Sequence, residues 1–398
     1  METKSESQLQ LLSGEEIKLR LDKILPMMKE REIDALLVSD NANILYLTGR
    51  VYCGYVYIEA DGSITYFVKR PSVLRGEAIE HIRKPEDITG ILEARGRKPH
   101  TVALELDTLS YNMTQRLLKV FDGAEAANAS DILRKARAVK TPGELALMEA
   151  SGVKQTQVYR SIPHLYVEGM SDVELQIEIE RALRLQGCLG QFRVNGPDME
   201  LFMGNILTGD NADTPSPYDF AMGGAGMNPS LPVGADGTII KPGHPVMVDV
   251  NGNFTGYMTD MTRCYITGDI PEIVQKAHDL SRDICHAIAK AAVAGAKAAD
   301  LYNIALDMAT KADMADYFMG HRYHAGFVGH GIGIAVNEPP VLSPRSRDVL
   351  VAGNVIAVEP KFVIPGIGAV GVENTYIVGN DSPARCITTA PEEIVSLD

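Results

Sequence analysis

The chain has 398 residues, 45% of them hydrophobic and 23% charged, a composition typical of a soluble globular protein long enough for two domains. Its formal net charge of −14 excludes the basic surface that nucleic-acid binding requires and disfavours contact with anionic membranes. The five cysteines are scattered without a CxxC pair, which predicts reduced thiols rather than a disulfide framework.

The N-terminal residues are acidic and lack the apolar segment of a secretory signal. No stretch has the apolar length that a bilayer-spanning helix needs. We therefore expect a cytoplasmic protein that binds neither membrane nor nucleic acid.

Strand and helix patterns alternate in the first third of the chain. Ser13 and Glu16 form a capping-box pattern, which predicts a helix from Gly14 to Glu30. This alternation predicts a small α/β domain over residues 1–137. The further elements expected in it are strands at 33–38, 55–58, 64–67 and 102–106 and helices around 73–82 and 111–120.

A second domain is expected over residues 138–398. Residues 198–232 are rich in Gly, Asn, Pro and Met and are interpreted as loops and short strands lining a site. The regular elements expected are helical patterns at 142–163, 171–185 and 271–315 and strands at 246–250, 258–266, 355–358 and 370–378.

Two segments of this second domain carry a carboxylate at each end of a predicted β-hairpin. Asp249 and Asp260 flank a turn-prone stretch, and Glu359 and Glu373 lie symmetrically about Pro365-Gly366. Folding each segment on itself brings its two acids together. Acids within apolar strands need compensation, because a buried carboxylate is costly unless it is paired or bound to a metal ion.

His330 lies in the sequence VGHGIGI, where flanking glycines let the backbone pass close to its neighbours. Taken singly, His330 fits an ordinary interior histidine, Asp260 a structural ion pair and Glu359 a turn residue. Together, four carboxylates and an imidazole predict a centre for two divalent cations, with Mn²⁺ favoured and Fe, Co or Zn as alternatives.

These motifs resemble the pita-bread fold superfamily of prolidase, aminopeptidase P, methionine aminopeptidase and creatinase. The resemblance lies in the words GHGIG, VEP and DMTR and in the spacing of the five residues, and it extends to the N-terminal segment IDALLVSDNANILYLTG. It implies an α+β fold, in which a pita-bread catalytic domain follows a smaller creatinase-type α/β domain. It also implies a homodimer.

By the same resemblance, Asp249 would chelate one metal ion, and Asp260 and Glu373 would bridge both. His330 and Glu359 would complete the shell of the ion opposite Asp249. Thr262 would steady one of the carboxylates.

Three positions depart from the peptidase members of the superfamily. The histidine expected before the first ligand is replaced by Pro232 and Val233, a second histidine by Asn337, and an arginine by Gly371. Positioning and proton transfer must then come from other groups. The candidates are His324, Asn337 and, more weakly, His321 and Tyr323, with Glu359 as the residue that shuttles the proton.

The sequence thus predicts a metallohydrolase resembling Xaa-Pro dipeptidase and aminopeptidase P, which cleaves a C–N bond in a small peptide by metal-activated water. One alternative keeps the fold and metals for a lyase or a non-peptide hydrolase, resembling dimethylsulfoniopropionate lyase or creatinase, because the three peptidase positions are replaced. A second alternative is a non-catalytic binding module, against which the intact set of five ligands speaks.

Overall fold

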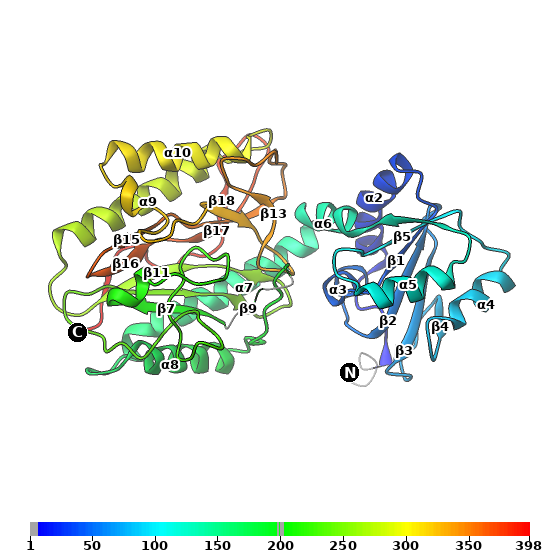
Figure 1. Cartoon of the computed structure of the whole chain (residues 1–398), viewed down its shortest axis with the longest axis horizontal. Helices are drawn as coiled ribbons and strands as arrows, with labels where there is room; N and C mark the ends of the chain where they lie inside the picture. Colours follow the sequence, from blue (N-terminus) through cyan, green and yellow to red (C-terminus); the bar gives the residue numbers. More distant parts are fainter. Residues whose placement is uncertain (1–6, 197–198, 200–202) are drawn as a thin grey trace. The chain divides into compact units, whose positions relative to one another are not determined.

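The structure is a computed structural model that describes residues 7–196, 199 and 203–398. The chain forms two compact units, Met1–Arg137 and Ala138–Asp398 (Figure 1). In the described part of the chain, no helix has both the length and the apolar character needed to cross a membrane.

The N-terminal unit is built on one mixed sheet of six strands in the order β4-β3-β2-β1-β5-β6. Strand β1 is antiparallel to β2 and parallel to β5. Its elements are α2 (Gly14–Glu30), β1 (Ala35–Val38), α3 (Asn41–Thr48), β2 (Cys53–Glu59), β3 (Ile64–Arg70), β4 (Ile79–His81), α4 (Asp87–Ala94), β5 (Thr101–Leu104), α5 (Tyr111–Val120), β6 (Glu125–Asn128) and α6 (Ser130–Ala138).

The helix expected from Gly14 is present as α2, and the Ser13 hydroxyl caps it by accepting a hydrogen bond from the Glu16 N–H at 3.1 Å. The helix expected around 73–82 is wrong. Turns follow Pro71, and Ala78 has a φ of 56°, which a right-handed helix cannot accommodate. The chain then forms β4, which pairs in parallel with β3.

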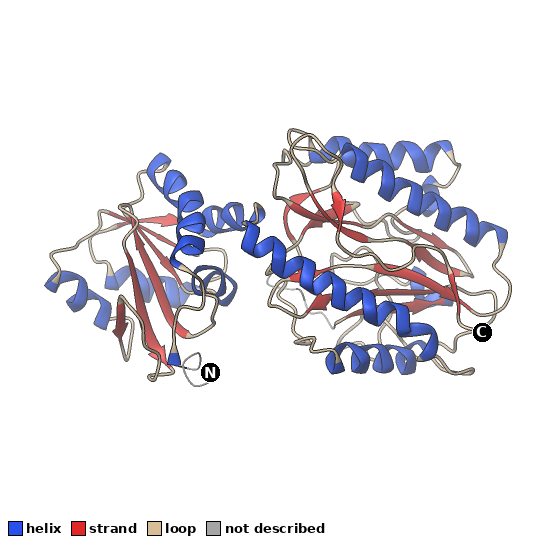
Figure 2. Cartoon of the chain, turned by 180° about the vertical axis from the view of Figure 1, so that it is seen from behind, coloured by secondary structure: helices blue, strands red, loops and turns tan. Residues whose placement is uncertain are grey.

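The C-terminal unit places its sheets between two pairs of helices. Figures 1 and 2 show α7 and α8 along one side of the strands and α9 and α10 along the other. Its helices are α7 (Pro142–Ser161), α8 (Asp172–Leu185), α9 (Glu272–Ala291) and α10 (Ala298–Lys311). Its strands are β7 (Gly204–Thr208), β8 (Val246–Val250), β9 (Gly252–Asn253), β10 (Met258–Thr259), β11 (Thr262–Ile266), β12 (Gly329–Gly331), β13 (Glu338–Val341), β14 (Val355–Val358), β15 (Lys361–Ile364), β16 (Gly368–Gly371), β17 (Asn374–Ile377), β18 (Arg385–Cys386) and β19 (Val395–Ser396); short 3₁₀ turns η1 (Ile162–His164), η2 (Gly209–Asp213) and η3 (Ala315–Tyr317) complete the elements.

The predicted helical region 271–315 is two helices rather than one. The chain leaves the helical conformation after α9, where Gly295 adopts a φ of 91°, and α10 begins at Ala298. The capping box predicted at Ser171 and Glu174 is present at the start of α8. Of the loop predicted over 198–232, Asp198 and residues 200–202 lie outside the described residues; the rest contains β7 and η2.

Two apolar layers hold the C-terminal unit together. One lies between α9 and α10 and the strands and includes Ile284, Ile288 and Phe362; the other lies under α7 and α8 and includes Ile179 and Val248. Burial of these side chains supplies most of the favourable free energy of folding. The strands between the two layers are therefore held tightly enough to fix polar groups placed among them.

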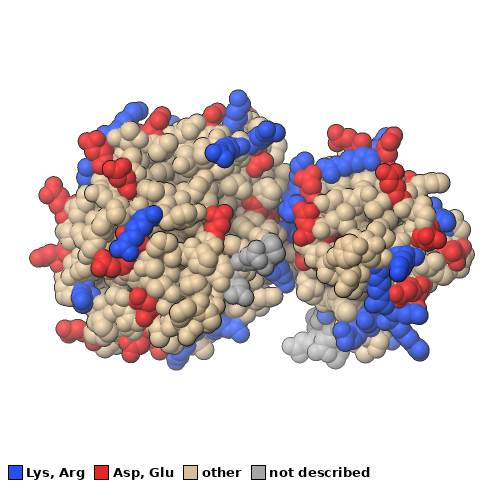
Figure 3. All heavy atoms as spheres, viewed as in Figure 1, with Lys and Arg blue, Asp and Glu red and all other residues tan. Residues whose placement is uncertain are grey.

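Two sheets of this unit position the site. One has the order β19-β11-β8-β7 and the other the order β13-β12-β14-β17-β18, while β15 and β16 form a hairpin that contacts the first sheet and α9. Figure 3 shows acidic and basic side chains interspersed over the visible face of this unit. The acids of the site are a separate group, of which Asp260, Glu359 and Glu373 are buried and Asp249 is partly buried.

His278 on α9 is fully buried, and neither of its ring nitrogens has a hydrogen-bond partner among the described residues. Burial lowers the pKa of His278 from 6.5 to about 4. The folded chain therefore stays neutral at this position while the unfolded chain takes up a proton as the pH falls through 6.5.

This burial predicts an acid-dependent loss of stability that belongs to His278. The free energy of unfolding should fall by about 3 kcal/mol more in the native chain than in His278→Leu between pH 7 and pH 4, since each unit of pKa shift corresponds to about 1.4 kcal/mol. Chemical unfolding of both proteins across this range measures the difference. Parallel stability curves would contradict it.

Candidate metal centre

The first predicted hairpin is confirmed. β8 pairs antiparallel with β11, and the pairing sets Asp249 opposite Thr262. Asp260 comes two residues before Thr262, so both aspartates lie at the same end of the hairpin. The Asp260 carboxylate is fixed further by accepting the Met261 N–H at 3.0 Å.

The second hairpin is also present, with its turn at Pro365-Gly366 between β15 and β16. Glu359 lies between β14 and β15, and Glu373 lies between β16 and β17. Since β14 and β17 pair with Val358 opposite Asn374, the two glutamates leave the sheet side by side.

His330 lies in β12, beside β14, with Gly329 opposite Val358. Its flanking glycines are required by close backbone contacts. A Cβ atom on Gly329 would lie 2.4 Å from the Ala357 carbonyl oxygen, and one on Gly331 would lie 2.1 Å from the Pro339 carbonyl oxygen. The interpretation of the GHG motif as a place of close strand approach is confirmed.

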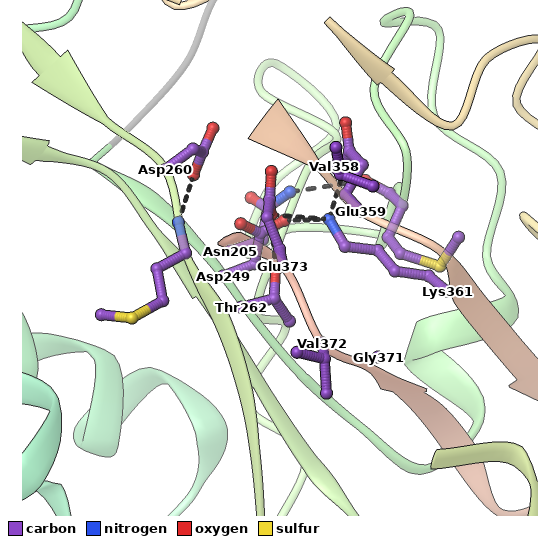
Figure 4. Close-up of polar contacts among 12 residues, drawn as sticks. Asn205, Asp249, Asp260, Thr262, Val358, Glu359, Lys361, Gly371, Val372 and Glu373 are labelled. Carbon is purple, nitrogen blue, oxygen red and sulfur yellow. Dashed lines mark hydrogen bonds and ion pairs between the residues drawn. The ribbon is translucent and has the colours of Figure 1, made fainter. Parts of the chain in front are cut away.

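The five predicted side chains converge at the meeting point of these strands. Figure 4 labels the four acids among them. Their ligand-capable atoms form two groups that share Glu373, and within each group the atoms lie within 4.8 Å of one another. One group is Asp260, His330 and Glu373; the other is Asp249, Glu359 and Glu373.

Lys361 lies inside the second group. Its Nζ atom is 2.7 Å from Asp249 Oδ2, 2.6 Å from Glu359 Oε2 and 3.4 Å from Glu373 Oε2 (Figure 4). The side chain of Lys361 is fully buried. Burial disfavours the charged amine, but these carboxylates outweigh that cost and raise the pKa of Lys361 well above its usual value.

In the first group, the buried acids and His330 shift one another's pKa values. Burial and the Asp249 carboxylate raise the pKa of Asp260 to about 7. Burial also raises the pKa of Glu373 well above its usual range, with the nearby Asp260 adding to the effect. Burial alone would lower the pKa of His330, but Glu359 and Asp260 reverse this and raise it to about 9.

Glu359 differs from its neighbours because cations flank it on both sides. Its Oε1 lies 3.3 Å from His330 Nε2, and its Oε2 accepts from Lys361. Burial would raise its pKa, but Lys361 and His330 lower it to about 2. Glu359 is therefore an ionised carboxylate over the whole physiological pH range.

The residues of the first group fit a divalent cation. Glu373 Oε1 is buried and has no hydrogen-bond partner among the described residues. His330 directs Nε2 toward the acids, while its Nδ1 lies 3.1 Å from the Gly331 carbonyl oxygen, which fixes the tautomer that a metal ligand needs. Two carboxylates and an imidazole are ligands that suit Mn, Fe, Co or Zn.

Two residues of β11 hold Glu373 in place. The Thr262 hydroxyl donates to Glu373 Oε2 at 2.7 Å, which is the steadying contact that the family resemblance implies. Arg263 is buried and donates to the carbonyl oxygens of Thr262 and Glu373, both at 2.8 Å. Its guanidinium also donates to Asn374 Oδ1 at 2.8 Å and forms no ion pair with Asp260 among the described residues.

A cavity of about 180 Å³ opens onto this centre. Its wall combines four of the five candidate ligands with apolar side chains, and it includes Val194 and Met199. The lining residues are Val194, Met199, Gly204, Asn205, Asp219, Phe220, Ala221, Asp249, Asn251, Asp260, Phe327, His330, Val336, Asn337, Val341 and Glu359.

Asn337 lines this cavity, but its amide is used to hold the loop opposite. Its Oδ1 accepts from the Asn195 N–H at 2.7 Å, and its Nδ2 donates to the Asn195 carbonyl oxygen at 2.8 Å. Asn337 therefore shapes the cavity wall.

The predicted histidine candidates lie elsewhere. His324 is not among the residues that line the cavity, and its Nδ1 lies 2.8 Å from the Phe318 carbonyl oxygen. His321 contacts Asp213 at 2.9 Å and, with Tyr323, borders a separate small pocket. We therefore assign no catalytic role to these residues.

The sequence interpretation missed Lys361. The signal was a charged residue that follows the Glu359-Pro360 pair and opens the apolar run Phe362-Val363-Ile364, where only a paired lysine can be buried. Arg263, directly after Thr262, was missed as the residue that holds the Glu373 backbone.

Comparison with known families agrees with this geometry. Residues 146–380 match Metallopeptidase family M24, and residues 20–139 match the Creatinase/Prolidase N-terminal domain. The chain belongs to metallopeptidase family M24 and is a hydrolase with the pita-bread fold. The family resemblance and the fold class predicted from the sequence are confirmed.

Individual relatives match along nearly their whole length. The Xaa-Pro dipeptidase of Pyrococcus furiosus is 24% identical over 384 residues, covering 94% of this chain and 99% of the relative. Among solved structures, the prolidase of Pyrococcus horikoshii OT3 has a TM-score of 0.78 at 22% identity and covers 94% and 99% of the two chains. The Xaa-Pro dipeptidase of Bacillus anthracis has a TM-score of 0.80 at 22% identity, with 96% and 99% covered.

The contact between Thr262 and Glu373 predicts a specific loss of metal affinity. Thr262→Val should weaken Mn²⁺ binding about 10- to 100-fold, because it releases a carboxylate of the centre, and should lower the free energy of unfolding by about 1–3 kcal/mol. Isothermal titration with Mn²⁺ and chemical unfolding measure the two effects.

Thr259→Val is the matched control. The Thr259 hydroxyl is buried and donates to Gln155 Oε1 at 2.7 Å, away from the carboxylates. This variant should lose similar stability and keep its Mn²⁺ affinity. Equal loss of affinity in both variants would show that the Thr262 contact has no special part in the centre.

Proposed function

We propose that this protein is a metal-dependent peptidase that hydrolyses Xaa-Pro dipeptides. The observation that carries the proposal is the cluster of Asp249, Asp260, His330, Glu359 and Glu373 at the edge of a small cavity. The names of the relatives, Xaa-Pro dipeptidase and prolidase, support the substrate class. A cavity of about 180 Å³ favours a short peptide over a long one.

The five acidic and imidazole residues are proposed to form the metal centre, with Mn²⁺ as the favoured ion because most of the donors are carboxylate oxygens. A divalent cation held by them supplies Lewis-acid activation of a water molecule and of the substrate carbonyl. The Lys361 ammonium lies among three of these carboxylates and therefore affects how many metal ions the cluster can bind.

Glu359 is proposed to move the proton. It lines the cavity and is kept ionised by Lys361 and His330, so it can accept a hydrogen bond from the attacking water and direct that proton toward the leaving amine. Phe220, Phe327 and Val336 offer an apolar surface for a proline ring. Asn337 is proposed to act by holding the Asn195 loop against this pocket.

The peptidase interpretation is preferred to the alternatives. The relatives named above are dipeptidases, which favours peptide cleavage over a lyase or a creatinase-like reaction. The intact five-residue cluster also disfavours a non-catalytic module.

Activity assays with Xaa-Pro dipeptides and added Mn²⁺ test the proposal. The protein should release free proline, and chelation should abolish the activity. His330→Ala should lower kcat/KM at least about 100-fold, because it removes a ligand from the centre. Absence of cleavage across an Xaa-Pro panel by the Mn²⁺-loaded protein would contradict the proposal.

His324→Ala is the matched control, since the same substitution is made outside the cavity. It should keep kcat/KM within about threefold of the native value, on the order of a surface substitution. A loss as large as that of His330→Ala would overturn the placement of the active site.

We also propose that the protein is a cytoplasmic homodimer. Its five cysteines are all free, as suits a reducing compartment. Sedimentation velocity should give twice the chain mass of 43.2 kDa, and a monomer would contradict the dimer.

A further inference from the structure

The cluster contains a cation of its own. Asp249, Glu359 and Glu373 form one of the two groups that can hold a metal ion, and the Lys361 ammonium contacts all three of these carboxylates. An ion bound by these oxygens would have to lie among them, where Nζ already lies. Two cations cannot share that space, because both their radii and their charges oppose it.

The position of Lys361 is built into the fold. Lys361 opens β15 and pairs with Gly371 on β16, so its backbone is fixed by the hairpin. A Cβ atom on Gly371 would lie 2.7 Å from Lys361 Cγ. The missing side chain at Gly371 thus makes the room through which the lysine stem reaches the carboxylates.

In the other group of ligands, Asp260 and His330 form no ion pair or hydrogen bond with this ammonium among the described residues. Asp260, His330 and Glu373 meet on the opposite side of the cluster, and Glu373 Oε1 is buried without a hydrogen-bond partner among the described residues. Glu373 therefore directs one oxygen toward Lys361 and leaves the other for a further cation. One divalent ion and one ammonium together offset three of the four carboxylate charges.

We propose that Lys361 takes the place of one of the two divalent ions, so that each chain binds a single ion at Asp260, His330 and Glu373. Glu359 then links the two cations, with Oε2 on the ammonium and Oε1 facing the side of His330. The inference concerns metal binding and rests on the proposed metal centre, but it does not depend on the identity of the substrate.

Counting bound ions tests the proposal directly. The purified full-length protein is saturated with Mn²⁺, freed of excess metal and analysed for metal and protein content, and its Mn²⁺ electron paramagnetic resonance spectrum is recorded. The native chain should hold one ion per chain with the spectrum of an isolated ion. Lys361→Ala should hold two ions per chain with the spectrum of a magnetically coupled pair.

A second pair of variants makes the test independent of how well Lys361→Ala folds. Asp249→Asn and Asp260→Asn remove the same charge from the two sides of the cluster. Asp260→Asn should raise the Kd for Mn²⁺ more than 100-fold, because it removes a ligand of the single ion. Asp249→Asn should raise it less than tenfold, because Asp249 holds the ammonium.

The outcomes separate the two proposals. Two ions in the native chain, or equal losses of affinity in the two aspartate variants, would overturn the replacement of an ion by Lys361 and leave the metal centre intact. A native chain that binds no Mn²⁺ would overturn both. One ion in the native chain, together with unequal losses in the aspartate variants, would support the assignment.

Discussion

Four carboxylates, three of them buried, lie close together in the C-terminal unit and must be compensated. Such a group is unstable unless cations or hydrogen-bond donors compensate it, because the desolvation of each charge costs several kcal/mol. The chain meets part of this cost itself, through Lys361 on one side and Thr262 on Glu373. The negative charge that remains on the other acids, with His330 beside them, favours binding of a divalent ion, and that ion would supply the catalytic chemistry.

The fold supplies rigidity where this charge is concentrated. Each pair of acids is set by an antiparallel pairing, and His330 is brought to Glu359 by the contact of β12 with β14. The glycines beside His330 permit that contact, and Arg263 ties the backbone at Glu373 to β11. An arrangement made of strands held between two apolar layers keeps ligand geometry better than loops do.

Much of this was predictable from the sequence, for physical reasons. A capping serine marks the start of helices such as α2, and turn residues mark the hairpins with an acid at each end. The family resemblance rested on the motifs around these acids and His330. The prediction of a helix at 73–82 was wrong. The apolar residues there have helical spacing, but the pairing of β4 with β3 determines the structure. The sequence near Lys361 indicates a buried, paired lysine, but its contacts with Asp249 and Glu373, and the contact of Arg263 with Glu373, are formed only in the folded sheets.

An anomalous difference map from crystals grown with Mn²⁺ would show directly whether Lys361 replaces one ion. We expect one peak, coordinated by Asp260, His330 and Glu373, with Lys361 Nζ still in contact with Asp249 and Glu359. Two peaks with the lysine side chain displaced, or no peak among these carboxylates, would contradict it.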